Sequence, residues 1–230
     1  MKQLIQIRCK NNKKNINVPI GSTLSEIFSL TGLKMEYGPV SCKVNNVVEG
    51  LHYRLYNNKD LEYVDLYSSS GLRNYTRSLF FVLCKAVHDL YPKSSVVIDI
   101  PVSNGYYCNL ELGHPVGLED VDKIRTRMQE IVDAKMPIRR YVVPTEDAIR
   151  MFEEKGDLAK VKLLKSAGKL YTTYYKIDDY VDYYYGSLLT NTKYLYLFGV
   201  EKYYDGILLR IPDKKDPSKL GELIRQDKMF

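Results

Sequence analysis

The sequence predicts an α+β protein in two parts: a small unit of strands around one short helix, then a larger unit of antiparallel strands packed on a long helix. Strand-like alternation and one short helical segment fill residues 1–67, and the small and polar run YSSSG at 67–71 then breaks the pattern. A length of 230 residues with 45% hydrophobic side chains is enough for two domains that each bury a core.

The first part, residues 1–67, begins with two predicted strands at 4–7 and 16–20, joined by turn chemistry at residues 11–13 (NNK). Thr23 and Glu26 stand at the spacing of a capping box, so a short helix is expected to begin there. Gly32 is placed to end that helix. Three β-like stretches follow, at VSCKVN, at residues 47–56 and at LEYVDLY.

The second part, residues 72–212, opens with a predicted amphipathic helix at 74–90 and a hairpin with its turn at 103–105. A second amphipathic helix is predicted at 118–134, followed by a strand at IRRYVV. Thr145 is expected to cap a helix that Gly156 stops, and Asp157 to cap another that runs to about residue 166. Residues 171–211 predict Tyr-rich strands, and the charged tail, 213–230, is expected to start a further helix and to lead into another domain.

The composition narrows the classes of function. The 21 tyrosines favour half-buried strands over a base-stacking platform, and a net charge of +6 is compatible with an anionic partner without requiring one. The four cysteines lack C-x-x-C spacing, which predicts reduced thiols and no zinc knuckle (Cys9, Cys42, Cys84 and Cys108). No apolar run approaches the roughly 20 residues of a membrane helix, and the start lacks a signal peptide, so we expect a soluble, cytoplasmic protein with no membrane partner.

Several segments resemble known families. VPIGSTLSEIF resembles the helix entry of the TGS domain, a ubiquitin-like β-grasp module of threonyl-tRNA synthetases and some GTPases. HDLYP, VSNGYYCNLEL, LEDVDKIRTRMQEIVD, EDAIRMFEEKGDLAKVKLL and DDYVDYYYG resemble, in order, the editing ("second additional") domain of threonyl- and alanyl-tRNA synthetases. RSLFFVLCKAVHDLYP, YVDYYYG and KYLYLFGVEKYYDGILLRIP are more similar to the same domain pair in bacterial uridine-kinase-like proteins. That resemblance implies a kinase domain in cis after residue 230, with ATP and Mg²⁺ as its cofactors, and no cofactor within residues 1–230.

The synthetase editing domain holds a metal-capable cluster with an H-x-x-x-H pair on its long helix and a C-x-x-x-H pair further on. The matching positions here are Arg77, Phe81, Tyr184 and Leu188. A cationic guanidinium and three side chains that do not ligate zinc occupy these positions, so we expect no metal and no hydrolytic editing by that route.

Other parts of the family's pocket are matched. The resemblance pairs Lys160 and Asp182 with a lysine and an aspartate of the editing pocket, and it places Tyr106 and Tyr107 on the hairpin that lines the cleft. We therefore expect a degenerate pocket that binds a nucleotide or an RNA end by charged hydrogen bonds and stacking. Its expected ligand-binding residues are Arg77, Tyr106, Tyr107, Lys160, Asp182 and Tyr184. The alternative is that Lys160 and Asp182 only form ion pairs or cap helices and that the tyrosines pack.

No other catalytic pattern is present in the sequence. His52, His88 and His114 are not at ligand spacing and are predicted to be structural, and neither a phosphate-binding G-x-x-x-x-G-K-[ST] loop nor a G-x-S-x-G elbow occurs. No catalytic residue is therefore assigned, and whether the chain is an enzyme stays open. The preferred function is a non-catalytic regulatory or ligand-binding region of a uridine (nucleoside) kinase. The alternatives are a free-standing tRNA- or RNA-binding protein and a metal-independent aminoacyl-ester hydrolase.

Overall fold

The computed structural model describes residues 3–224 and has the mixed α+β class that the sequence predicts. Its first unit is a five-stranded sheet in the order β2-β1-β5-β3-β4. The strands are β1 (Leu4–Cys9), β2 (Lys14–Pro19), β3 (Ser41–Val44), β4 (Val47–Glu49) and β5 (Lys59–Val64). Strand β1 pairs antiparallel with β2 and parallel with β5, and helix α1 (Leu24–Thr31) buries Leu24 and Ile27 in the core of this unit.

The predicted ends of α1 are confirmed. The Glu26 amide donates to Thr23 Oγ1 at 3.2 Å, the Thr23 amide donates to Glu26 Oε2 at 2.7 Å, and Gly32 follows the helix with φ of 69°. The predicted strand over residues 47–56 is wrong beyond Glu49. Residues 51–55 instead turn across the start of α1, where the Leu24 amide donates to Tyr53 O at 2.9 Å, so the backbone bonds of this segment go to a helix start.

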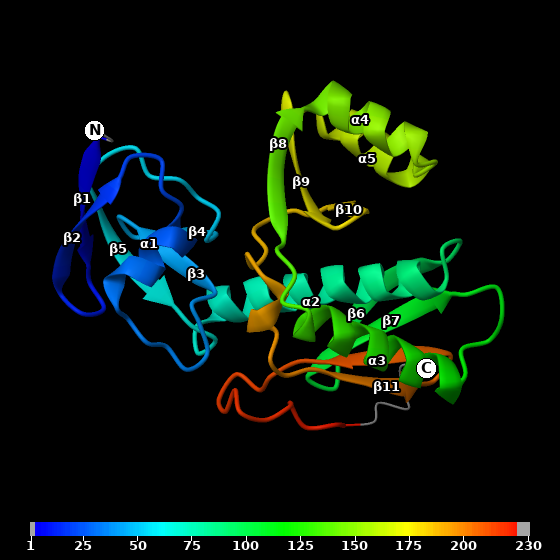
Figure 1. Ribbon diagram of the computed structural model, residues 1–230. Helices are drawn as coiled ribbons and strands as arrows, with labels where there is room; N and C mark the ends of the chain where they lie inside the picture. The colour runs from blue at the N-terminus through cyan, green and yellow to red at the C-terminus, as the bar shows by residue number, and fades with distance from the viewer. Residues whose placement is uncertain (1–2, 225–230) are drawn as a thin grey trace.

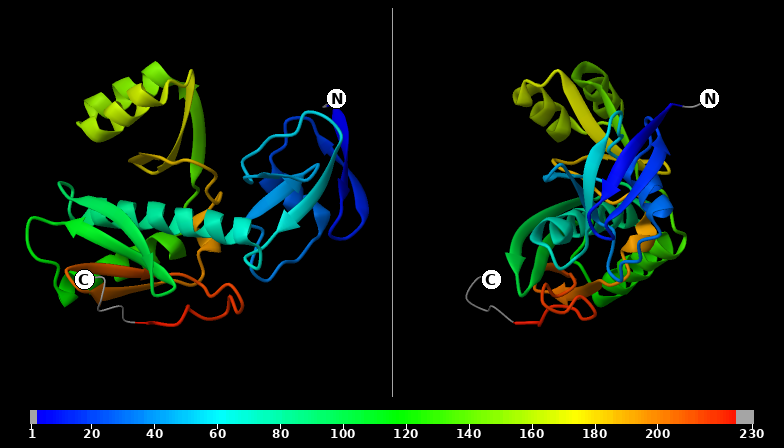
Figure 2. Two further views of the ribbon diagram at one scale, coloured as in Figure 1. Left: turned by 180° about the vertical axis from the view of Figure 1, so that it is seen from behind. Right: turned by 90° about the vertical axis from the view of Figure 1, so that its left-hand side faces the viewer.

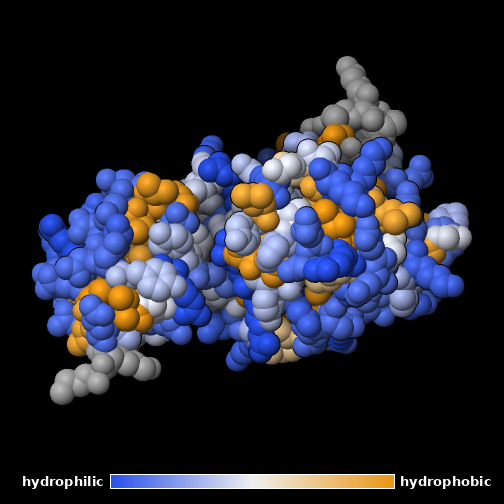
Figure 3. Space-filling view, turned by 90° about the horizontal axis from the view of Figure 1, so that it is seen from above, coloured by the Kyte–Doolittle hydropathy of each residue, from blue (hydrophilic) through white to orange (hydrophobic). Residues whose placement is uncertain are grey.

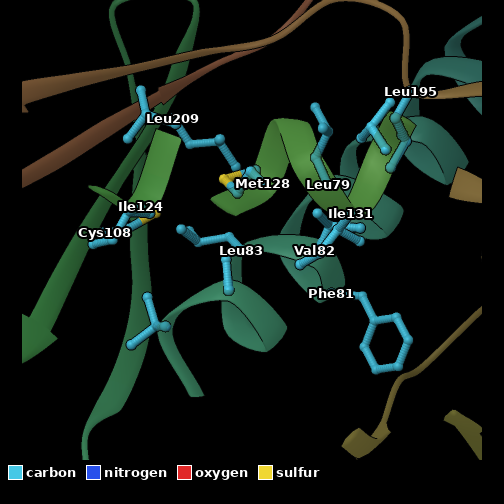
Figure 4. Packing of buried hydrophobic residues seen from close by; sticks show 14 of the residues in the cluster. Leu79, Phe81, Val82, Leu83, Cys108, Ile124, Met128, Ile131, Leu195 and Leu209 are labelled. Atoms are coloured by element: carbon cyan, nitrogen blue, oxygen red, sulfur yellow. The ribbon is translucent and has the colours of Figure 1, made fainter. Parts of the chain in front are cut away.

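Helix α2 (Ser69–Leu90) runs through the middle of the molecule, with the first unit at its N-terminal end (Figures 1 and 2). It begins at Ser69, before the predicted residue 74, because the Ser68 hydroxyl accepts from the Gly71 amide and caps the helix at 3.0 Å. Helix α3 (Leu118–Asp133) lies beside α2. Both helices bury their apolar faces on a sheet of order β11-β12-β7-β6, and Figure 4 shows Leu79, Leu83 and Met128 in that core. Its strands are β6 (Ser95–Val102), β7 (Gly105–Glu111), β11 (Gly199–Tyr203) and β12 (Gly206–Arg210).

A separate layer stands on the other side of α2, as Figures 1 and 2 show. It is a three-stranded antiparallel sheet, β10-β9-β8, covered by two helices with their own small core around Phe152 and Leu164. Its elements are β8 (Arg139–Pro144), α4 (Thr145–Glu154), α5 (Leu158–Ala167), β9 (Tyr171–Ile177) and β10 (Tyr180–Tyr183). The two sheets of the second unit are joined by residues 184–198, which hold only the short 3₁₀ helix Thr192–Tyr194.

The predicted cap of α5 is confirmed, because Asp157 accepts from the Lys160 amide at 3.1 Å. The predicted cap of α4 is wrong: Pro144 occupies the cap position, and Thr145 is helical, with its hydroxyl 2.9 Å from that of Thr172. The helix predicted in the tail does not form within residues 213–224, where Asp213 accepts from two following amides in a turn. Its remaining part, residues 225–230, lies outside the described residues. In the part of the chain described, no helix is both long and apolar enough to cross a bilayer.

Candidate ligand-binding site

Apolar packing fills three of the four positions that the resemblance matches with metal ligands of the synthetase editing domain. Phe81 and Leu188 are fully buried, and the Phe81 ring meets the Tyr184 ring edge-on with centroids 5.6 Å apart. Figure 4 shows Phe81 projecting from α2 away from Leu79 and Met128. Arg77, one turn earlier on α2, supplies a cation in place of an imidazole. Within residues 3–224 no group of three or more His, Cys, Asp or Glu side chains is placed to hold a metal ion.

Lys160 and Asp182 form an ion pair of 2.8 Å between α5 and β10. Lys160 also contacts Asp157 at 2.9 Å, and Asp182 accepts from the Tyr180 hydroxyl at 3.0 Å and the Tyr183 amide at 2.6 Å. Burial raises the pKa of Asp182 more than Lys160 lowers it; burial pulls the pKa of Lys160 down, but its two carboxylate partners shift it upward overall. Both charges are thus engaged within the protein, and neither residue lines the cavity described next.

A cavity of about 490 Å³ opens where the first unit, the start of α2 and the β8–β9 strands meet. The first unit is held there by a bond between His52 Nε2 and Ile138 O of 2.6 Å and by a close approach of Gly50 to Ser187, where a Cβ would lie only 2.5 Å from the serine Cβ. Five charged side chains line the cavity: Glu49, Arg73, Arg77, Arg140 and Lys169. Tyr53, Tyr171, Tyr175, Tyr183, Tyr184 and Tyr185 add aromatic surface.

Four cationic side chains therefore face one carboxylate. In the described part of the chain none of the four is in an ion pair, whereas Arg127 and Arg210 are matched with carboxylates at 2.8 and 2.6 Å. The carboxylate, Glu49, has its pKa raised by burial, an effect that Arg140 opposes. A cavity with this excess of positive charge favours an anionic ligand.

Arg77 is held in a fixed orientation at the wall of the cavity. Its Nε donates to Ser187 O at 3.2 Å and its Nη2 donates to Asn74 Oδ1. Gly186 allows this placement: its φ is +106°, and a Cβ there would lie 2.9 Å from the Arg77 Cζ. Burial lowers the pKa of Arg77, and the positive charge of Arg73 one turn away lowers it further. An arginine keeps its charge in proteins, so Arg77 presents a half-buried guanidinium that forms no ion pair within residues 3–224.

Two tyrosines stand at the mouth of the cavity with their rings largely open. Tyr171 is 63% exposed and Tyr185 is 80% exposed, and the Lys169 ammonium lies 5.2 Å from the centre of the Tyr185 ring. An exposed aromatic ring beside cations is a surface on which a base can stack.

Of the three tyrosines expected in the pocket, Tyr184 lines the cavity, and Tyr106 and Tyr107 lie elsewhere. Tyr106 and Tyr107 are on β7 in the four-stranded sheet; Tyr106 packs edge-on against Phe80, with centroids 4.9 Å apart, and Tyr107 belongs to a cluster on the opposite face of that sheet. Sequence reasoning therefore missed Arg73, Arg140 and Lys169. The first of these was recognisable, since it stands four residues before Arg77 on one helix face. The other two come from a strand and a loop, and only the folded chain brings them to α2.

Comparison with known proteins supports the resemblance to threonyl-tRNA synthetases. Curated threonine–tRNA ligases are similar to this chain: that of Acetivibrio thermocellus is 28% identical over 163 residues, which are 70% of this chain and 26% of the ligase. That of Aromatoleum aromaticum is 28% identical over 197 residues, or 82% of this chain and 31% of the ligase. That of Carboxydothermus hydrogenoformans is 30% identical over 153 residues, or 66% of this chain and 23% of the ligase.

This chain thus spans less than a third of the length of these relatives. No family model matches it. The similarities support the resemblance to the editing-like region of threonyl-tRNA synthetases. They do not support a uridine kinase as the parent protein.

Proposed function

We propose that this region is a non-catalytic binding module, built on an editing-like fold, whose cavity holds a phosphate-bearing ligand, either a nucleotide or the end of an RNA. The convergence of Arg73, Arg77, Arg140 and Lys169 on one cavity without ion-pair partners among residues 3–224 is the observation that carries this proposal. Phosphate oxygens accept charge-assisted hydrogen bonds from guanidinium groups in forked pairs. The apolar filling at Phe81 and Leu188 supports binding without metal-assisted hydrolysis.

The two units have finer assignments within this proposal. The first unit is a TGS-type β-grasp domain, which its mixed sheet of order β2-β1-β5-β3-β4 and its single helix support. The second unit is a second-additional-type editing domain, which the similarity to threonine–tRNA ligases supports.

The parent protein is a separate question. The resemblance of the Tyr-rich segments implies a nucleoside kinase, in which this region would regulate a kinase domain that follows residue 230 and uses ATP and Mg²⁺. Reading the native gene past the codon for Phe230 tests this directly. An open frame that continues into a G-x-x-x-x-G-K-[ST] loop supports the kinase, and a stop codon soon after it favours a free-standing RNA-binding protein. The similarity to threonine–tRNA ligases supports an RNA-related role for this region and makes no prediction about the reading frame after Phe230.

Calorimetric titration with nucleotides and with a short RNA tests binding at the cavity. Arg73→Gln/Arg140→Gln removes two of the lining cations. Lys155→Gln/Lys162→Gln removes the same charge from exposed positions outside the cavity, one just after α4 and one on α5. A hydrogen bond to a charged group contributes about 1.5–3 kcal/mol, so each lost contact weakens binding at least about tenfold. The proposal fails if both double variants weaken binding equally, because that result indicates only non-specific attraction.

A deacylation assay tests the non-catalytic part of the proposal. Wild-type protein is expected to leave an aminoacylated RNA intact over times at which an editing enzyme hydrolyses it. Hydrolysis that Lys160→Ala abolishes would contradict the proposal and favour the metal-independent hydrolase.

A further inference from the structure

The excess of positive charge in the cavity favours a ligand with several negative charges close together. Four cationic side chains face the single carboxylate of Glu49. A nucleic acid strand carries one negative charge per residue, spaced by about 3.4 Å along a duplex axis, and a phosphomonoester carries about −1.5 to −2. A chain of two or three linked phosphoryl groups places more negative charge within the same few ångströms, and so it matches the excess of positive charge more closely than one RNA terminus does.

Arg73 and Arg77 lie one turn apart on the same side of α2, where two like charges repel each other. That repulsion contributes to the lowered pKa of Arg77, and no carboxylate within residues 3–224 forms an ion pair with either residue to relieve it. Of the five N–H donors of Arg77, one on Nε and one on Nη2 are used by Ser187 and Asn74. The remaining donors are held in a fixed direction, which lowers the entropic penalty of binding neighbouring phosphoryl oxygens.

The size of the cavity and the aromatic rings at its mouth fit the nucleoside part of a nucleotide. Its volume of about 490 Å³ falls within the range of roughly 300–1,000 Å³ that small-molecule sites occupy. Tyr171 and Tyr185 offer open rings at its mouth. Figure 3, the view from above, shows several apolar patches among hydrophilic residues.

We propose that the ligand of this cavity is a free nucleoside di- or triphosphate, whose phosphate chain lies among Arg73, Arg77, Arg140 and Lys169 and whose base stacks on Tyr185. The inference rests on the proposed function and narrows it from any phosphate-bearing ligand to a nucleoside polyphosphate. Binding does not require a metal ion, because the protein cations balance the phosphate charge.

The test is a calorimetric titration of the full chain with UMP, UDP and UTP and with AMP, ADP and ATP, in a chelator that removes Mg²⁺. Inorganic tripolyphosphate and a short single-stranded RNA with a free 3′ end are the two further probes. Affinity is expected to rise at least tenfold from mono- to triphosphate. Arg73→Gln is expected to weaken triphosphate binding more than monophosphate binding, since it removes one phosphate contact.

Tyr185→Leu separates base from phosphate recognition. It is expected to weaken nucleotide binding about fivefold or more and to leave tripolyphosphate affinity unchanged, because stacking on an aromatic ring contributes roughly 1–3 kcal/mol per base. Arg73 and Tyr185 are both exposed, so the variants should fold, and circular dichroism checks that they do.

Equal affinity across each phosphate series overturns the polyphosphate inference. RNA binding that depends on Arg73 and Arg140, with no nucleotide binding, also overturns it but leaves the proposed function intact. Absence of binding by every probe contradicts both.

Discussion

Replacing Lys160 by methionine separates structural pairing from ligand binding. The substitution keeps most of the length of the side chain and removes its charge, which leaves Asp182 without its 2.8 Å partner. The Asp182 side chain is 10% exposed and that of Lys160 is 27% exposed, so the pair is mostly shielded from water. Two neutral donors, the Tyr180 hydroxyl and the Tyr183 amide, would remain on the carboxylate.

The expected loss of stability lies between two known limits. Breaking a fully buried ion pair costs about 3–5 kcal/mol, and exposed pairs contribute only about 0–1 kcal/mol. The partial exposure of Lys160 places the expected loss at about 2–3 kcal/mol, which lowers the melting temperature of a domain of this size by roughly 4–12 °C. Ligand affinity should not change, because Lys160 does not line the cavity.

The sign of the pH dependence follows from the pKa of Asp182. Burial already raises that pKa in the folded protein, and losing Lys160 raises it further above the unfolded value. The penalty of the buried charge is thus fully present above the folded pKa and disappears as the pH falls toward the unfolded pKa. The stability gap between wild type and Lys160→Met should narrow as the pH is lowered from 7 to 4. In Lys160→Met/Asp182→Asn no charge is stranded, and this pH dependence should be lost.

Thermal unfolding followed by circular dichroism measures the first effect, and calorimetric titration measures ligand affinity. Lys162→Met, at an exposed position on the same helix, is the matched control and should change neither quantity. The reasoning is refuted if Lys160→Met leaves the melting temperature unchanged and weakens ligand binding. That result would make the lysine a ligand contact, as the sequence resemblance implies.

Three further outcomes follow from single contacts. Gly186→Ala should weaken nucleotide binding at least about tenfold, because a Cβ at φ of +106° would displace the Arg77 guanidinium; unchanged affinity in titration would show that Arg77 is not needed. Burial lowers the pKa of His52, so the free energy of unfolding should fall as the pH drops below about 6.5, the pKa of an unfolded histidine. His52→Phe should make the free energy of unfolding, measured by urea titration, depend less on pH. An unchanged pH dependence would show that other groups cause the loss of stability. Burial raises the pKa of the Cys42 thiol to about 12, so iodoacetamide at pH 8 should label it only after unfolding, and rapid labelling of native protein read by mass spectrometry would contradict its burial.

The features that the sequence predicted correctly are local ones. The Thr23 cap, the Asp157 cap and the hairpin turn each depend on residues within four positions of one another, and the turn has positive φ at Ser103 and Asn104 as a two-residue hairpin requires. The misplaced strand after Glu49 has strand-like residues, but its backbone bonds go to the start of α1. Local propensity cannot reveal a partner so far along the chain.

At the candidate site, too, the sequence revealed a residue that can be placed by local spacing and missed residues that only the fold brings together. Arg77 was found because a helical position can be counted from Pro92, and the structure places it at the wall of the cavity. Arg140 and Lys169 reach the same cavity only through the pairing of β8 with β9 and the packing of that sheet over α2. Tyr106 was assigned by resemblance alone, and its strand lies in the sheet on the other side of α2.

The most direct test of the cavity as the binding site is photo-crosslinking of an azido-nucleoside triphosphate, followed by mass spectrometric mapping of the labelled peptides. Binding in the cavity predicts labels on the peptides that contain Tyr171 and Tyr185, and predicts their loss in Arg73→Gln/Arg140→Gln or with excess unlabelled nucleotide. Saturable labelling of the β7 peptide that contains Tyr106 and Tyr107, with none at the cavity, would contradict the assignment.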